Sequence, residues 1–171
     1  MEELNLIYLS LGSDLGDKIL NLNKAVQSLQ EKAGRITSIS SVYESAPLGF
    51  DSETKFYNIC LELQTQLSPI DLLNQLKEIE NSQGRKTKSI DEIYSSRIID
   101  IDILFYNNQK IGTKDLSIPH RLFKKRNFVL LPLEEIAPYL IDPSTHLTIR
   151  QLLKNSPDQS CVSKISSTIT I

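Results

Sequence analysis

The sequence of 171 residues predicts an α+β domain in which helices pack against one mostly antiparallel sheet. Three observations predict this class: short runs of alternating apolar residues recur, helical stripes separate the runs, and Gly, Pro and Asn cluster between them. The length favours one domain, to which we assign residues 1–160. Residues 161–171, rich in Ser and Thr, are expected to be a tail of uncertain structure.

The first part of the chain predicts a strand, a helix and a second strand. Residues 4–11 are apolar and suit a strand, and residues 12–16, with two glycines, break it. Apolar residues then recur at helical spacing over 17–34, after which residues 36–43 again have the pattern of a strand. Residues 46–49 contain Pro and Gly and predict a loop, because both residues resist regular pairing.

The middle of the chain repeats this order. Residues 56–67 alternate between apolar and polar side chains and predict a long strand. Ser68 and Pro69 are favourable residues at a helix start, and Gly84 ends the helix that they begin. Residues 85–96 are polar and charged without a period, so we expect an exposed loop.

A last strand and helix complete the predicted domain. Residues 98–106 have the strongest strand pattern in the chain. The Asn107-Asn108 pair predicts a turn into a further short strand around residues 110–111. Residues 126–136 have helical spacing and stop before Pro138.

Composition excludes several classes of function. The formal net charge is -2, so no overall positive field favours nucleic acid or a membrane surface as partner. The N-terminus lacks the basic start and apolar stretch of a signal peptide. Cys60 and Cys161 have no metal-ligand spacing, and Cys60 lies in an apolar run typical of a core residue. We therefore expect a cytoplasmic protein.

The strand at residues 98–106 carries two carboxylates on one face. Side chains two apart on a strand point the same way, so Asp100 and Asp102 face one side and the neighbouring isoleucines the other. Two adjacent carboxylates repel unless a positive charge lies between them. The pattern favours Mg²⁺, which takes oxygen ligands and completes its shell with water and phosphates. The alternative is an amphipathic strand whose exposed face is merely acidic.

Two basic clusters precede and follow this strand and suit a polyphosphate, because Arg and Lys bind phosphate oxygens. Each cluster alone is equally typical of a solvated loop or helix start, and a lone histidine such as His120 is more often a surface or packing residue than a catalyst. No glycine loop of the Walker, Rossmann or protein-kinase type is present. The candidate cations are Arg85, Lys88 and Arg97 before the aspartates, and His120, Arg121 and Arg126 after them.

Several motifs in order resemble the 6-hydroxymethyl-7,8-dihydropterin pyrophosphokinase family. The most specific is the run over residues 97–104, Arg-Ile-Ile-Asp-Ile-Asp-Ile-Leu, which is similar to the family signature Arg-x-x-Asp-x-Asp-Ile-Leu. Other motifs that resemble the family are Leu-Gly-Ser-Asp-Leu-Gly over 11–16, the run over 41–49, Phe-Tyr-Asn over 56–58, and Ile-Pro-His over 118–120.

The resemblance implies a ferredoxin-like α-β-α sandwich and a metal-dependent reaction. ATP would give its β,γ-pyrophosphate to the hydroxyl of 6-hydroxymethyl-7,8-dihydropterin and leave as AMP, a step of folate biosynthesis. Asp100 and Asp102 would bind two Mg²⁺, and Arg97 and His120 would complete the catalytic group. The expected partners are these small molecules, and a monomer is expected.

The resemblance also assigns the substrate-binding residues. Phe56 and Phe128 would stack on the two faces of the pterin ring, and Asn58 would read its hydrogen-bonding edge together with the backbone of Ser45, Ala46 and Leu48. The expected ATP-binding residues are Glu80 at the ribose, Ile103 and Ser117 near the adenine, and Arg85, Lys88, Arg97, His120, Arg121 and Arg126. Residues 86–96 are polar with few apolar anchors, so we expect a mobile lid that orders over ATP; the alternative is a plain surface loop.

Two other classes use the same fold. One is a non-catalytic nucleotide-binding or regulatory module, and the other is a generic ferredoxin-like interaction domain. A binding-only relative would be expected to lack a metal ligand or a cation that binds phosphate. Since Asp100, Asp102, Arg97 and His120 are all present, the sequence favours an enzyme.

Overall fold

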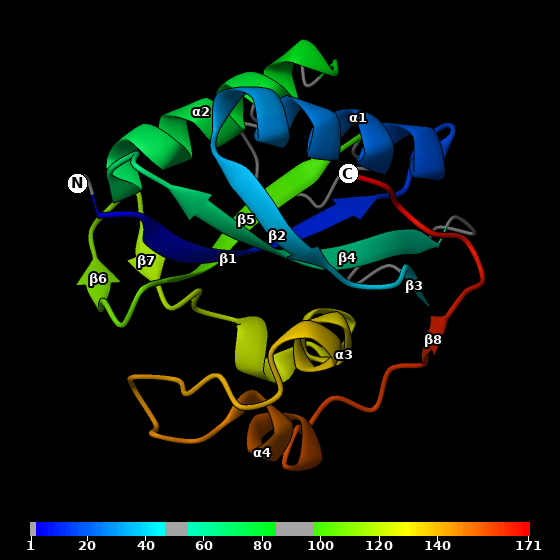
Figure 1. The fold of residues 1–171 in the computed structure, drawn as a ribbon. Helices are drawn as coiled ribbons and strands as arrows, with labels where there is room; N and C mark the ends of the chain where they lie inside the picture. The colour runs from blue at the N-terminus through cyan, green and yellow to red at the C-terminus, as the bar shows by residue number, and fades with distance from the viewer. Residues whose placement is uncertain (1–2, 47–54, 85–97) are drawn as a thin grey trace.

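The chain folds into three layers, with helices on both faces of a central sheet (Figure 1). The computed structural model describes residues 3–46, 55–84 and 98–171. Over these residues, six strands form one antiparallel sheet in the order β5-β1-β4-β3-β8, and β2 also pairs with β4. The strands are β1 (Asn5–Ser13), β2 (Arg35–Ile39), β3 (Tyr43–Ser45), β4 (Phe56–Thr65), β5 (Asp100–Tyr106) and β8 (Val162–Lys164). The predicted α+β class and its helix–sheet–helix layering are confirmed.

The two helical layers differ in how they cover the sheet. In Figure 1, α1 and α2 lie together over one face, whereas α3 lies on the opposite face with α4 beyond it. Because strand side chains alternate between faces, the sheet has two separate apolar cores, one under α1 and α2 and one under α3. The helices are α1 (Lys18–Lys32), α2 (Pro69–Ser82), α3 (Asn127–Ile136), α4 (Ile149–Lys154) and the 3-10 turn η1 (Phe123–Lys125).

The starts of α1 and α2 follow from side-chain caps. The Asp17 carboxylate accepts a hydrogen bond from the Leu20 N–H at 3.0 Å. Ser68 caps α2 in the same way through the Asp71 N–H at 3.2 Å, and Pro69 occupies the first turn. Both helices therefore begin at their capping residues, and both starts agree with the sequence prediction.

Strand β5 has the predicted alternation, with a bulge at its centre. Ile101 and Ile103 are buried in the core under α1 and α2, while Asp100 and Asp102 point to the α3 side. The register with β1 shifts by one residue at Leu104, which places Phe105 in the core under α3. The freed carbonyl of Leu104 accepts a hydrogen bond from the His120 N–H at 3.0 Å, so the bulge holds His120 beside β5.

Two predicted strand segments differ in the structure. The single strand expected over residues 36–43 is divided into β2 and β3, which pair with successive parts of β4. Between them, the Ser40 hydroxyl accepts the Cys60 N–H at 2.9 Å and thereby takes the place of a ladder partner. The strand expected after the Asn107-Asn108 turn does not pair with β5. It is β6 (Ile111–Gly112), which pairs with β7 (Ser117–Ile118) as a separate ribbon.

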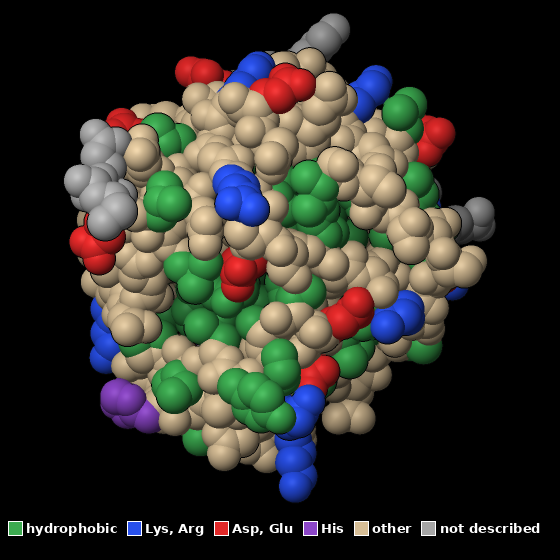
Figure 2. Space-filling view, in the orientation of Figure 1, with side chains coloured by type: hydrophobic (Ala, Val, Ile, Leu, Met, Phe, Trp, Pro, Cys, Tyr) green, Lys and Arg blue, Asp and Glu red, His purple; other side chains and the backbone are tan. Residues whose placement is uncertain are grey.

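The C-terminal part of the chain is more ordered than its sequence pattern predicts. Helix α4 and strand β8 were not predicted, and β8 adds an edge strand beside β3. Ile169 is buried in the core under α1 and α2, so the tail packs on the sheet. Within the described ranges, none of the helices combines the length and hydropathy that crossing a membrane requires. Figure 2 shows acidic and basic side chains interspersed over one face of the molecule.

Candidate active site

Asp100 and Asp102 are the centre of the candidate site. Across the ladder they pair with Gly12 and Ser10 of β1, so nothing larger than a serine stands beside them on that strand. The Asp102 side chain is 38% exposed and can reach a ligand from solvent. Among the described residues, no group of three or more His, Cys, Asp or Glu side chains could hold a metal. A donor set limited to two carboxylates suits Mg²⁺, whose remaining positions are taken by water and phosphate.

His120 lies next to these carboxylates and is neutral at pH 7. Its Nδ1 accepts a hydrogen bond from the Leu122 N–H at 3.2 Å, so the proton is on Nε2, which is 3.8 Å from Asp102 Oδ2. Burial and the positive charge of Arg126 lower the pKa of His120 to about 4, against the opposing effect of Asp100. His120 can therefore donate one hydrogen bond toward the acidic face without adding a charge.

Glu80 has a buried structural contact that the sequence did not reveal. It lies near the end of α2, where it is only 4% exposed. Its Oε1 accepts a hydrogen bond from the Ile101 N–H at 2.8 Å, between the two aspartates of β5. This bond ties α2 to the strand that carries Asp100 and Asp102, and the ribose contact expected for Glu80 stays a prediction.

The expected pterin-reading residues form a buried group on β3 and β4. Asn58 is 3% exposed, and its amide donates to the Ser45 hydroxyl at 2.8 Å. Ser45 pairs with Phe56 across the ladder, which brings the three residues to the same end of the sheet. Gly12 lies against this group, since a Cβ atom there would be 3.1 Å from Asn58 Oδ1 and 3.8 Å from the Phe56 ring. Ala46 follows β3 and is exposed.

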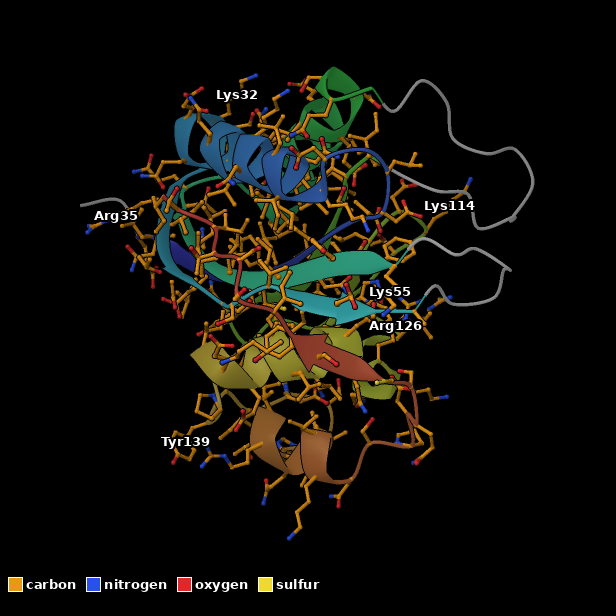
Figure 3. All side chains as sticks on the ribbon, turned by 90° about the vertical axis from the view of Figure 1, so that its right-hand side faces the viewer. Lys32, Arg35, Lys55, Lys114, Arg126 and Tyr139 are labelled. Carbon is orange, nitrogen blue, oxygen red and sulfur yellow. The ribbon has the colours of Figure 1, made fainter. Side chains whose placement is uncertain are left out.

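The start of α3 lies over the same end of β4. The Cys60 thiol donates to the Val129 carbonyl oxygen at 3.5 Å, and burial raises the pKa of Cys60, which keeps this donor protonated. Phe128 immediately precedes Val129 and is half-buried, with the Arg126 guanidinium 5.6 Å from its ring centre. Figure 3 shows Lys55, before β4, and Arg126, before α3, at one end of the molecule. Phe128 therefore lies at the start of the helix that packs on the face of β4 to which Asn58 and Cys60 belong.

The remaining expected residues divide into three groups. Arg121 is exposed in the turn before η1, and Ser117 lies half-buried on β7. The Ile103 side chain is buried in the core, so any contact with adenine would come from its backbone. Leu48, Arg85, Lys88 and Arg97, and the lid expected over residues 86–96, lie outside the described residues.

Two site-adjacent residues were missed from the sequence. The sequence predicts a break at Gly12 after the first strand, but β1 continues through it to Ser13. Glu135 of α3 accepts hydrogen bonds from Tyr43 and Ser41 and so fixes α3 against the segment that leads into β3. A glycine inside a strand pattern can signal close approach of a neighbour, whereas the role of Glu135 has no local sequence signal.

A family model described as 7,8-dihydro-6-hydroxymethylpterin-pyrophosphokinase matches residues 8–138. The chain is 40% identical over 136 residues to a Porphyromonas gingivalis protein named 2-amino-4-hydroxy-6-hydroxymethyldihydropteridine pyrophosphokinase, covering 79% of this chain and 92% of that protein. A protein of the same name from Aquifex aeolicus is 42% identical over 137 residues, covering 80% of this chain and 83% of its own length.

Longer relatives contain a similar region. The chain is 44% identical over 156 residues to the folic acid synthesis protein FOL1 of Dictyostelium discoideum, which is 90% of this chain but only 23% of that protein. The solved structure of wild-type Plasmodium falciparum HPPK-DHPS with pteroate superposes with a TM-score of 0.75 at 18% identity. That match covers 91% of this chain and 45% of the Plasmodium chain, and it supports the fold.

Proposed function

The chain belongs to the 7,8-dihydro-6-hydroxymethylpterin-pyrophosphokinase family, and we propose that Asp100 and Asp102, with bound Mg²⁺, carry the family's reaction here. The chain is thus a pyrophosphokinase of folate biosynthesis, which transfers pyrophosphate from ATP to the hydroxyl of 6-hydroxymethyl-7,8-dihydropterin. The proposal concerns how this chain's residues bind the two substrates and the metal.

One observation supports the assignment more than any other. Asp100 of β5 and Asn58 of β4 both pair with Gly12, so an acidic centre and a buried amide lie two strands apart on one row of the sheet. With neighbouring strands about 4.8 Å apart, the two Cα atoms are roughly 10 Å apart. That span fits a phosphate and metal site at one end and a small heterocycle at the other.

At the acidic end, the two carboxylates would hold two Mg²⁺ together with the phosphates of ATP. When bound, Mg²⁺ would neutralise phosphate charge and polarise the attacking and leaving oxygens. The Glu80 bond to the Ile101 N–H fixes the backbone between the two aspartates, so both ligands keep their direction. The Nε2–H of neutral His120 would donate a hydrogen bond to a phosphate oxygen, and Arg121 and Arg126 would add positive charge.

At the other end, the ring of the pterin would lie between Phe56 and Phe128. Flat heterocycles gain from stacking on aromatic faces, and both rings are half-buried, so each retains accessible surface. Asn58 would offer its Oδ1 to ring donors, because its amide nitrogen already donates to Ser45. The same buried group would exclude water from the pterin edge, which favours the pterin hydroxyl as acceptor of the pyrophosphate.

The remaining proposals concern the state of the protein. We propose a monomer that works in the cytoplasm on small molecules, without a nucleic-acid or membrane partner. A net charge of -2 supports the absence of a nucleic-acid partner.

A direct assay tests the proposed function. The purified chain is supplied with ATP, MgCl₂ and 6-hydroxymethyl-7,8-dihydropterin, and AMP formation is followed. AMP should form only when both the pterin and Mg²⁺ are present, and EDTA should stop it. AMP formation at the same rate without the pterin, or with EDTA in excess, would contradict the proposal.

A further inference from the structure

The C-terminal segment of residues 156–165 connects the two elements that form the proposed pterin pocket. It lies beyond residues 8–138, which the family model matches. Figure 1 shows the chain running from α4 past α3 to β8, which lies at the edge of the sheet beside β3. The segment therefore contacts both the helix that carries Phe128 and the strand that carries Ser45.

The contact with the helix is a cap supplied from a distant part of the chain. Arg126, at the N-cap position of α3, makes no side-chain cap hydrogen bond. The Asp158 carboxylate takes that role, accepting the Asn127 N–H at 2.7 Å, while the Asn127 amide donates to the Asp158 carbonyl oxygen at 3.1 Å. Two hydrogen bonds thus join the segment to the residue next to Phe128.

The contact with the sheet is a short antiparallel ladder. Ser45 pairs with Val162 and Tyr43 with Lys164. The ladder continues one residue further, where the Ile165 N–H donates to the Val42 carbonyl oxygen at 2.9 Å. Lys164 also reaches Glu135 of α3 at 3.5 Å, so the same strand contacts the helix a second time.

The segment is itself held at both of its ends. Before it, Leu152 of α4 is buried in the core under α3. Its last residue, Ile165, packs against the core under α1 and α2, and Ile169, beyond the segment, is buried in that core. Within the segment, the Ser160 N–H donates to the second carboxylate oxygen of Asp158 at 2.8 Å. Because the segment is anchored in both cores, it is ordered and can restrain the position of α3 relative to β3, which a loose tail could not do.

We propose that Asp158 is a positioning residue for pterin binding, which holds the start of α3, and with it Phe128, at a fixed separation from β3 and β4. This inference rests on the proposed function, because it assigns the pterin to the space between these elements. Stacking on two rings depends on their separation, so a small shift of α3 weakens pterin binding. The aspartates and Glu80 belong to β5 and α2, which the segment does not touch among the described contacts. Arg126 is the one proposed phosphate-binding residue next to the cap. Because the other proposed ligands of ATP and the metal are held elsewhere, ATP binding depends on the segment less than pterin binding does.

The test compares Asp158→Ala with the parent in the full chain. Affinity for 6-hydroxymethyl-7,8-dihydropterin is measured by titration calorimetry with saturating Mg²⁺ and a non-hydrolysable ATP analogue, and affinity for the analogue is measured alone. The variant should bind the pterin about fivefold more weakly, the size of a typical lost helix cap, and the analogue within about twofold of the parent. The KM for the pterin should rise while the KM for ATP stays close to the parent value.

Three further variants make the result specific. Asp158→Asn keeps an oxygen that can accept the Asn127 N–H and should retain most of the pterin affinity. Gln159→Ala is the matched control in the same segment, because Gln159 is exposed and its side chain makes no hydrogen bond to any residue that the structure describes. Should Asp158→Ala not fold, Asn127→Ala, which removes only the amide bond to the Asp158 carbonyl, should still weaken the pterin more than the nucleotide.

The outcomes separate the inference from the proposed function. If the parent binds the pterin and the Asp158→Ala or Asn127→Ala variant binds it equally tightly, or loses pterin and nucleotide affinity alike, the positioning role is overturned. If the parent binds the ATP analogue but no pterin under any condition, the proposed substrate assignment fails and the inference falls with it.

Discussion

Asp100 and Asn58 lie on the same face of the sheet, each paired with Gly12 of the strand between them. One carries the carboxylate that we propose as a metal ligand, and the other carries the buried amide that we propose for recognition of the pterin. The residue between them has no side chain, so the surface from Asp100 to Asn58 is free of a Cβ at its midpoint. The Asn58 amide oxygen and the Phe56 ring lie against this glycine, so a side chain added at Gly12 would press on the residues proposed to bind the pterin.

Gly12→Ala should therefore weaken pterin binding. The new methyl group would be 3.1 Å from Asn58 Oδ1 and 3.8 Å from the Phe56 ring, so the Asn58 side chain must move by a few tenths of an ångström. We expect pterin affinity to fall about tenfold, since a misplaced polar partner costs about 1–2 kcal/mol. Calorimetric titration with the pterin, in the presence of Mg²⁺ and an ATP analogue, measures the loss.

Gly112→Ala is the matched control for this variant. A Cβ atom at Gly112 would meet no heavy atom within 4 Å, so both substrates should bind as in the parent. The prediction fails if Gly12→Ala and Gly112→Ala give the same pterin affinity in folded protein.

Asp100→Asn and Asp102→Asn should each remove most of the activity. Each substitution keeps the size of the side chain but removes one of the two charges that would hold Mg²⁺. We expect kcat/KM to fall roughly a hundredfold or more, the loss typical of a major electrostatic contact at a reacting centre. Steady-state AMP formation over a range of MgCl₂ concentrations gives both the loss and any shift in the metal requirement.

Glu31→Gln serves as control for the loss of one negative charge, because Glu31 is exposed on α1. It should leave both kcat and the Mg²⁺ dependence unchanged. Activity close to that of the parent in either aspartate variant would contradict the metal assignment.

The sequence predicted the elements whose signals are local. The alternation over β5 predicted that Asp100 and Asp102 share a face, and the Ser68-Pro69 pair predicted the start of α2. Both depend only on neighbours within a few positions. The predicted positions of α1, α3 and β4 also agree with the structure to within a few residues, because each has a long apolar period.

What the sequence could not predict depends on partners far apart in the chain. Strand β8 is only three residues long, and it forms because β3 offers an open edge. The cap on α3 comes from Asp158, 31 positions after the residue whose N–H it accepts. The buried bond from the Ile101 N–H to Glu80 is likewise encoded by no local pattern, and the ribose contact expected for Glu80 stays a prediction. Such contacts exist only once the layers have assembled.

Glu135→Ala should destabilise the protein in a pH-dependent way. Tyr43 donates to Glu135 at 2.5 Å, and the Ser41 N–H and hydroxyl donate at 3.0 and 2.8 Å. Burial opposes ionisation, but these bonds and the charge of Lys164 lower the pKa of Glu135 below its ordinary value. We expect the free energy of unfolding at pH 7 to fall by about 1–2 kcal/mol, the range for hydrogen bonds to a charged group at a partly exposed site.

The direction of the pH effect follows from the lowered pKa. The contribution of Glu135 is complete above the pKa of an unfolded Glu, about 4.3, and is lost as the pH falls through the folded-state value. Urea unfolding at pH 7 and at pH 4 and below should therefore show the variant approaching the parent in acid. The preceding residue of α3, Glu134, pairs with the exposed side chain of Arg150, and Glu134→Ala should cost less than 1 kcal/mol. Equal losses for the two variants, or a gap that widens in acid, would contradict this role for Glu135.

Phe128→Ala should separate the two substrates most clearly. The ring is half-buried at the start of α3, beside the Arg126 guanidinium, on the face of the sheet that carries Asn58. Its loss removes one stacking surface from the pterin and little from ATP, whose phosphates are expected at β5. We expect pterin affinity to fall at least tenfold, from roughly 1–2 kcal/mol of stacking and burial, with nucleotide affinity within about twofold.

Tyr139→Ala is a control of the same chemical kind. Tyr139 also carries an arginine over its ring, Arg150 at 5.2 Å, but it is 72% exposed and follows the end of α3 rather than its start. Its removal should leave both affinities unchanged, which separates loss of an aromatic ring in general from loss at the pocket. Phe128→Leu restores apolar area without a π-face, so it should recover only part of the pterin affinity. Equal weakening of pterin and nucleotide in folded Phe128→Ala would remove Phe128 from the pterin pocket.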